Sequence, residues 1–140
     1  MMAELKNIFD IAGRSMAAQQ VRLNTVASNI ANANVRSGSA EAAFRPLRPV
    51  FQTYFEGGRR NAQMATTDVR EVVELDRDPQ QIHDPGHPLA EEQGFVYVSA
   101  VDVNEEMVDM LEASRQYQNN LEVVTTLRTL MLRTVNMGKS

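Results

Sequence analysis

The sequence predicts an α+β fold, mainly α, in which long N- and C-terminal helices pair as an antiparallel coiled coil. Two observations lead to this prediction. Apolar residues recur every three or four positions at both ends of the chain, and short valine-rich stretches punctuated by proline and glycine lie between them. We expect three parts: an N-terminal helix in residues 1–36, a β-rich and loop-rich middle segment in residues 37–101, and a C-terminal helix in residues 102–140.

The N-terminal helix is predicted by an apolar stripe whose steps average close to the spacing of a coiled-coil seam. Gln19 occupies the one position that the stripe skips. The helix should end near Asn34, because Ser37, Gly38 and Ser39 follow and favour termination. The residues expected in the stripe are Leu5, Ile8, Ala12, Met16, Leu23, Val26, Ile30 and Ala33.

The C-terminal helix has a similar stripe and a clear start. Asp102 can cap the helix, and Glu105, three residues later, would complete an arrangement like a capping box. Arg128 interrupts the stripe, while Leu127 and Leu130 widen it. The residues expected in the stripe are Val103, Met107, Met110, Ser114, Tyr117, Leu121, Val124, Met131 and Val135.

The middle segment reads as strands and turns. Residues 42–55 contain two prolines and cannot form a regular helix, and residues 68–75 and 94–101 are valine-rich and predict strands. Turns are expected at Gly57-Gly58, at Asp78-Pro79 and at residues 84–86.

Composition excludes several functional classes. The formal net charge is −4, so the chain lacks the net positive field that a nucleic-acid-binding protein uses to attract phosphates. The sequence contains no cysteine, which removes disulfides, cysteine-ligated zinc and thiol catalysis. Charged residues interrupt the N-terminal region repeatedly, so we expect neither a transmembrane helix nor a cleaved signal peptide.

Both histidines of the chain lie in one short stretch, which makes it the only candidate for catalysis or metal binding. On a helix, His83 and His87 would share one face, but the prolines and the glycine of this stretch forbid that helix. An enzyme built on these histidines and Asp84 would need a further base or ligand, and the sequence identifies none. We therefore expect no catalytic residue, cofactor, metal or small-molecule ligand, and we interpret the stretch as a rigid loop formed by Asp84, Pro85, Gly86, His87 and Pro88.

A pair of amphipathic helices of this length should be only marginally stable alone, because the cost of ordering the helices opposes the gain from burying their apolar stripes. Roughly a dozen medium-sized side chains at about 1.5–3 kcal/mol each oppose some sixty residues at about 1–2 kcal/mol each. Further burial should come from other copies or from partner proteins. The alternative is that the stripes form the ordinary core of a small α+β domain.

Several motifs give the chain a family resemblance. Residues 27–34 read ASNIANAN, residues 84–88 read DPGHP, and the C-terminal helix contains Glu106-Met107 and the run ASRQY at residues 113–117. In this combination the sequence resembles the bacterial flagellar axial proteins, the family of rod, hook and hook-associated proteins, over residues 5–137. It departs from the family pattern at Val35, where threonine is common, and at His83, where tyrosine is usual.

The resemblance implies a structural subunit of the flagellar proximal rod, the drive shaft that transmits motor torque. Such a subunit is exported unfolded by the flagellar type III apparatus, polymerises through its terminal helices and resides in the periplasmic basal body. The implied partners are copies of itself, the export apparatus and other rod proteins (FlgB, FlgF, FlgG and the rod-base protein FliE). The alternatives are another axial rod protein, or a coiled-coil adaptor or export chaperone.

The resemblance also assigns roles to individual side chains. The asparagines of the first helix either face solvent or hydrogen-bond to neighbouring subunits at the helix end. Tyr117 is expected in the seam, and Arg115 is expected near Glu112 or an acid of an adjacent subunit. The residues expected to pair the helices or contact other subunits are Ile8, Ala12, Met16, Leu23, Val26, Asn29, Ile30, Asn32, Asn34, Met107, Met110, Ser114, Arg115, Tyr117, Leu121, Val124 and Met131.

Overall fold

The computed structural model describes residues 2–55 and 65–139. It contains two long helices and five strands, in the order α1 (Met2–Ala31), β1 (Arg36–Ser37), β2 (Leu47–Phe55), β3 (Ala65–Glu74), β4 (Gln80–His83), β5 (Phe95–Val98) and α2 (Val103–Met137). The predicted fold class, two long terminal helices with a small antiparallel β middle, is confirmed. The turn expected at Gly57-Gly58 lies outside the described residues.

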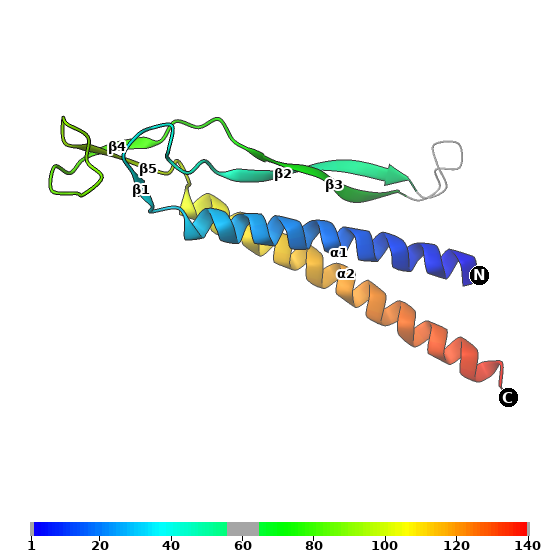
Figure 1. Ribbon diagram of the computed structural model, residues 1–140. Helices are drawn as coiled ribbons and strands as arrows, with labels where there is room; N and C mark the ends of the chain where they lie inside the picture. The colour runs from blue at the N-terminus through cyan, green and yellow to red at the C-terminus, as the bar shows by residue number, and fades with distance from the viewer. Residues whose placement is uncertain (1, 56–64, 140) are drawn as a thin grey trace.

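The molecule is elongated, and α1 is its middle layer (Figure 1). The chain runs along α1, returns through the strands and runs back along α2, so the two helices are antiparallel. The antiparallel hairpin β2–β3 lies along α1, and α1 contacts both this hairpin and α2. The second sheet, with strand order β1-β5-β4, lies beyond the ends of the helices where α1 stops and α2 starts (Figure 1).

Two faces of α1 are covered by different elements. On the face toward α2, the Ser15 hydroxyl accepts a hydrogen bond from Asn120, and Asn29 donates one to Glu106. On the face toward the hairpin, the Thr66 hydroxyl of β3 donates to the Ile11 carbonyl at 3.1 Å. A helix that is packed on two sides needs two apolar stripes, which explains why the single predicted stripe covers only part of the buried set.

The start of α2 was predicted correctly, but the role given to Glu105 was wrong. The Asp102 carboxylate accepts hydrogen bonds from the backbone N–H groups of Asn104 and Glu105, at 2.9 and 3.4 Å, and so caps the helix. The Glu105 carboxylate accepts hydrogen bonds from Arg77 at 3.0 and 3.2 Å. Glu105 thus binds Arg77, which lies between β3 and β4, and does not form a capping box. A guanidinium that donates two hydrogen bonds binds a carboxylate more strongly than one backbone N–H does.

The buried column of α2 is displaced by one residue from the predicted stripe at several turns. Glu106 is 1% exposed and Ala113 is fully buried, whereas Met107 is 54% exposed and Leu121 is 45% exposed. The prediction followed apolarity, but the positions that face α1 here carry a small residue and an acid whose charge is compensated. The physical reason is close approach: an alanine at the contact lets the helix backbones come near each other.

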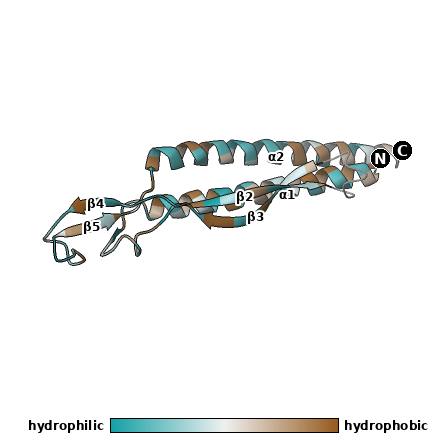
Figure 2. Ribbon diagram, turned by 90° about the horizontal axis from the view of Figure 1, so that it is seen from above, coloured by the Kyte–Doolittle hydropathy of each residue, from teal (hydrophilic) through white to brown (hydrophobic). Residues whose placement is uncertain are grey.

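The hydrophobic core is small and consists mainly of alanine. Its buried apolar residues are Ala12, Ala18, Val26, Ala33, Ala43, Val96 and Ala113. Hydrophobic residues recur along α2, as the brown segments of its ribbon in Figure 2 show. Many of its large apolar side chains are exposed. Neither helix in the described part of the chain is long and apolar enough to cross a membrane.

The strands agree with the sequence only in part. The stretches predicted at residues 68–75 and 94–101 correspond to β3 and β5, which begin at Ala65 and Phe95. Strands β1, β2 and β4 were not predicted, because β1 has two residues, β2 contains Pro49 and β4 is only four residues long. The turn expected at Asp78-Pro79 is wrong: both residues lie in an irregular segment between β3 and β4 that has no turn there.

The loop between β4 and β5 contains Pro85, Gly86 and Pro88 of the stretch that holds the two histidines. Pro85 and Gly86 lie in a turn closed by the His87 N–H, which donates to the Asp84 carbonyl at 3.1 Å. The ring of His83 packs edge-on against Phe95, with 5.0 Å between ring centroids. The two histidines thus make contacts within the β4–β5 segment itself. Among the described residues, no group of three or more His, Cys, Asp or Glu side chains could hold a metal ion.

Candidate functional site

The most buried polar side chain of α1 is Asn29, and it joins the helix to the hairpin. Its Oδ1 accepts a hydrogen bond from the Leu47 N–H at 2.8 Å, and its Nδ2 donates to the Leu47 carbonyl at 2.9 Å. The amide therefore pairs with one residue of β2 as a neighbouring strand would. This pair fixes where the hairpin starts relative to the end of α1.

The same amide also binds α2. Asn29 Nδ2 donates to Glu106 Oε2 at 3.0 Å, and Arg48 Nη2 lies 2.5 Å from Glu106 Oε1. The hydrogen bond to Glu106 raises the pKa of the Arg48 guanidinium, against the opposing effect of burial. A buried carboxylate is tolerated here because it has both a cation and an amide as partners.

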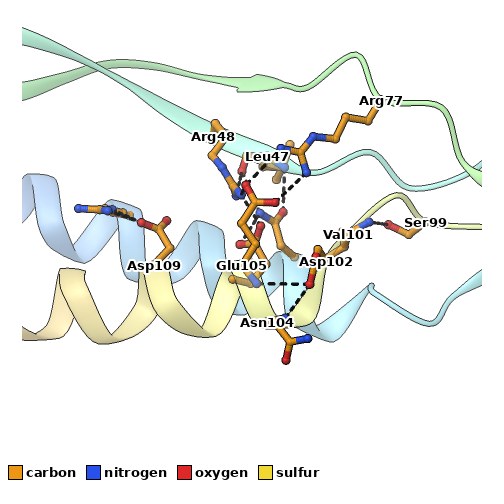
Figure 3. A network of polar contacts seen from close by, with 12 residues as sticks. Leu47, Arg48, Arg77, Ser99, Val101, Asp102, Asn104, Glu105 and Asp109 are labelled. Atoms are coloured by element: carbon orange, nitrogen blue, oxygen red, sulfur yellow. Dashed lines mark hydrogen bonds and ion pairs between the residues drawn. The ribbon is translucent and has the colours of Figure 1, made fainter.

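A second, more exposed acid extends this group. Arg48 and Arg77 converge on Glu105 from the hairpin side (Figure 3). Hydrogen bonding from Arg77 lowers the pKa of the Glu105 carboxyl, with a smaller contribution from Arg48. We call Asn29, Arg48, Arg77, Glu105 and Glu106 the polar cluster; it ties α1, α2 and the β-segment together at one end of the helix pair.

Further polar contacts fix the register between the helices. The Arg22 Nε donates to Asp109 Oδ1 at 2.8 Å, and its Nη2 lies 3.3 Å from Glu112 Oε2. Further along, Asn120 Nδ2 donates to the Ser15 hydroxyl at 2.9 Å. Together with the bond between Asn29 and Glu106, these contacts run in antiparallel order and specify a single alignment of α1 against α2.

The structure places the expected interface residues in three environments. Ala12, Val26 and Asn29 are buried, whereas Asn34, Met107, Arg115 and Leu121 are exposed. The others are partly buried: Ile8, Met16, Leu23, Ile30, Asn32, Met110, Ser114, Tyr117, Val124 and Met131.

The asparagines differ from the expectation that all face solvent or other subunits. Asn29 has its partners within its own chain, and Asn32 Nδ2 donates to the Ser28 carbonyl one turn earlier, at 2.8 Å. The Leu47 backbone reaches the Asn29 amide because β2 begins where it crosses the end of α1. Glu112, expected near Arg115, is instead bound by Arg22 and by Gln116, whose Nε2 lies 3.4 Å from Glu112 Oε1.

Sequence reasoning missed Arg22, Arg48, Arg77 and Glu106 as site residues. The predicted stripe passes through Met107 rather than Glu106, so an acid one position beside the stripe gave no local signal of burial. No spacing rule links it to arginines 58 and 29 residues away in the chain. The chemistry of the cluster is structural, since its charges face one another and are satisfied by protein groups.

Comparisons with known proteins identify the family. A model described as "Flagella basal body rod protein" matches residues 9–36, and a model described as "Flagellar basal body rod FlgEFG protein C-terminal" matches residues 92–137. These ranges include most of the two helices and three of the five residues of the polar cluster, Asn29, Glu105 and Glu106. Arg48 and Arg77 lie between the two matches.

Three relatives that match over nearly their full length are all flagellar basal-body rod proteins named FlgC. The flagellar basal-body rod protein FlgC of Salmonella typhimurium (strain LT2) is 41% identical over 135 residues, which cover 96% of this chain and 98% of the relative. The FlgC protein of Yersinia enterocolitica is 39% identical over the same coverage. That of Aquifex aeolicus (strain VF5) is 33% identical over 138 residues, covering 99% of this chain and 100% of the relative. The chain therefore belongs to the FlgC family of flagellar basal-body rod proteins and is a structural subunit of the rod.

Proposed function

We propose that this rod subunit belongs to the proximal rod, is exported unfolded by the flagellar type III apparatus and polymerises through its terminal helices to transmit torque. Its place would then be the periplasmic part of the basal body. Its partners would be copies of itself, the neighbouring rod proteins FlgB, FlgF and FlgG, the rod-base protein FliE and the export apparatus. No catalytic, nucleic-acid-binding or small-molecule-binding role is part of the proposal.

The distribution of burial along α2 carries this proposal. All residues of α2 are described, and its buried residues are Glu106 and Ala113, both in the first third of the helix. Beyond them, Leu121, Leu130, Leu132 and Val135 are exposed. Covering such a side chain is worth on the order of 1 kcal/mol or more, so assembly supplies stabilisation that the single chain lacks.

The same distribution suits a chain that must unfold before export. The outer half of the helix pair is held by little buried apolar surface, so it opens at low free-energy cost. Neighbouring subunits would supply the missing contacts after export, as in other segments that become ordered on binding.

A pair of variants separates assembly from folding. Leu121→Asp changes a side chain that is half-exposed in the single chain, whereas Val26→Asp places a charge at a fully buried position. We expect Leu121→Asp to leave expression and helicity unchanged but to abolish incorporation into basal bodies and swimming. Val26→Asp should lose both folding and incorporation, and Leu121→Met should retain both. Normal swimming of the Leu121→Asp strain would contradict assembly through this helix.

Dilute solution distinguishes the rod subunit from an adaptor or chaperone. A rod subunit alone should be monomeric, and limited proteolysis should remove the outer ends of α1 and α2 before it cuts near the polar cluster. A stable helical oligomer whose ends resist the protease would support the adaptor instead.

A further inference from the structure

A second column of side chains on α2 is exposed except at the partly buried Ser114. It starts at Met107, one position after the buried Glu106, and advances by alternate steps of four and three residues to Val135. Its large apolar members are exposed: Met107, Leu111, Leu121, Leu132 and Val135. We call this column the outer seam of α2. Its regular spacing is that of a helix-pairing seam, although α1 of the same chain occupies the adjacent column.

A matching column runs along α1 on the side away from α2. It starts at Ala3 and advances by alternate steps of three and four residues to Ala31, and every one of its members is exposed. Its residues are small or polar, and a Cβ added at Gly13 would have open space around it. We call this column the outer face of α1. A flat helix face of this kind admits large side chains from another helix.

We propose that the outer seam of α2 docks in antiparallel orientation on the outer face of α1 of a second copy of this chain, with Leu121 against Ala17. The inference rests on the proposed assembly through the terminal helices, and it specifies the two surfaces, the occupant and the register.

One register places four of the five large residues of the seam opposite an alanine of the face, and the fifth, Leu132, opposite the stem of Lys6. When Leu121 faces Ala17, the equal alternation of steps in the two columns brings Met107 to Ala31 and Leu111 to Ala27. A slip by one heptad places Leu121 opposite Asp10 in one direction or Asn24 in the other. Both slips place Leu121 against a polar residue and leave fewer large residues opposite small ones than the proposed register does, so the apolar residues favour that one alignment.

The polar residues select the same alignment independently. It brings Gln118 opposite Gln20, and Arg128 opposite Asp10. Within residues 2–55 and 65–139, neither Asp10 nor Arg128 has an ion-pair partner in its own chain. A second copy thus provides the complementary charge for both, which is why we assign this surface to a second copy.

The register also predicts how the copies are arranged. Within one chain, Ser15 meets Asn120; across the proposed contact, residue 15 would lie at the level of residue 123. The second copy is therefore displaced by three residues along the helix axis, about 4.5 Å at the rise of an α-helix. Both copies point the same way, and each pairing leaves one seam and one face free. The contact is heterologous and continues into an open array.

Cysteine cross-linking tests the contact directly, since the natural chain has no cysteine. The test variant carries Ala17→Cys and Leu121→Cys and is produced as the cell's rod subunit; isolated basal bodies are oxidised and run on a non-reducing gel. We expect a ladder of dimers and higher multimers of this chain. The two cysteines cannot pair within one chain, because residue 17 lies on the side of α1 away from α2.

The matched control carries Ala17→Cys and Val108→Cys. Val108 is also exposed, but it borders the groove between β2 and α2, away from the outer seam. We expect no ladder from this variant. A ladder from the control but none from the test variant would overturn the proposal, as would cross-links only to a protein of different mass. If swimming and incorporation persist without a ladder, the rod function stands and this contact fails.

Charge reversal gives a second test that needs no cysteine. Asp10→Arg and Arg128→Asp should each lower the number of copies per basal body or the swarming rate by about threefold to tenfold, the range for losing an exposed pair and creating repulsion. The chain with both reversals should return to within about twofold of the natural protein. Two single losses without recovery in the double variant would overturn the pairing of these residues.

Discussion

Removing Arg48 should destabilise the chain more than its partly exposed position suggests. The proposed change is Arg48→Met, which keeps the length and the apolar stem of the side chain but removes its charge. Glu106, which is 1% exposed and lies 2.5 Å from Arg48, would lose its only ion-pair partner in the described structure. Glu105 would keep its hydrogen bonds from Arg77.

The expected loss follows from the burial of Glu106. Breaking a buried ion pair by removing one partner costs about 3–5 kcal/mol. Two features place this case at the lower end: the Arg48 side chain is 21% exposed, and Asn29 still donates to Glu106 at 3.0 Å. For a chain of 140 residues the entropy of unfolding is roughly 0.3 kcal/mol per kelvin. A loss of about 3 kcal/mol therefore lowers Tm by about 10 °C.

Thermal and urea unfolding of the purified chain, followed by circular dichroism, would measure this loss. The control is Arg45→Met, because Arg45 lies 2.7 Å from Asp76 but that acid is 96% exposed; the expected loss is below about 1 kcal/mol. A chain carrying both Arg48→Met and Glu106→Met should recover most of the lost stability, since no buried charge remains. If Arg48→Met costs no more than Arg45→Met, or the double variant no less than the single, the reasoning fails.

Two further predictions concern Glu105 of the polar cluster and the loop between β4 and β5. Because Arg77 lowers the pKa of Glu105, that carboxylate stabilises the fold above its ordinary pKa of 4.5 and loses this effect as pH falls through the lowered value; the stability difference between the natural chain and Arg77→Ala, measured by urea unfolding, should be full at pH 7 and vanish in acid. Gly94→Ala should lower stability by about 1–2 kcal/mol, because Gly94 has φ +81° and a Cβ would lie 3.1 Å from Pro85 Cγ; Gly86→Ala, with 3.9 Å to its nearest neighbour, should be nearly neutral. Equal acid profiles in the first case, or equal losses in the second, would contradict these assignments.

The helices could be predicted from the sequence because their signals are local. The apolar period and the cap at Asp102 act within a few residues, and both appear in the structure. The face of each helix was harder to predict. Two adjacent columns, each repeating every seven residues, run along α2, and a stripe chosen by apolarity passes from one column to the other. Met110 and Tyr117 belong to the column that α1 covers, whereas Met107 and Leu121 belong to the outer seam.

The polar cluster could not be predicted because its partners are distant in the chain. Arg48 and Glu106 come together only once β2 crosses the end of α1, and Asn29 is the residue at that crossing. From sequence, an asparagine near a helix end is equally compatible with solvent, a cap or a neighbouring subunit. Only the tertiary arrangement shows that its amide pairs with a β-strand backbone.

The position of the polar cluster determines which end of the helix pair is held by the chain itself. Asn29, Arg48 and Glu106 lie where α1 ends and α2 begins, whereas no side-chain hydrogen bond or ion pair joins residues 2–14 of α1 to residues 121–136 of α2. Burial declines in the same direction. Local opening therefore starts at the outer ends of both helices and reaches the cluster last. The end that opens first also contains Asp10 and Arg128, so a neighbouring copy would close the part of the pair that the single chain holds most weakly.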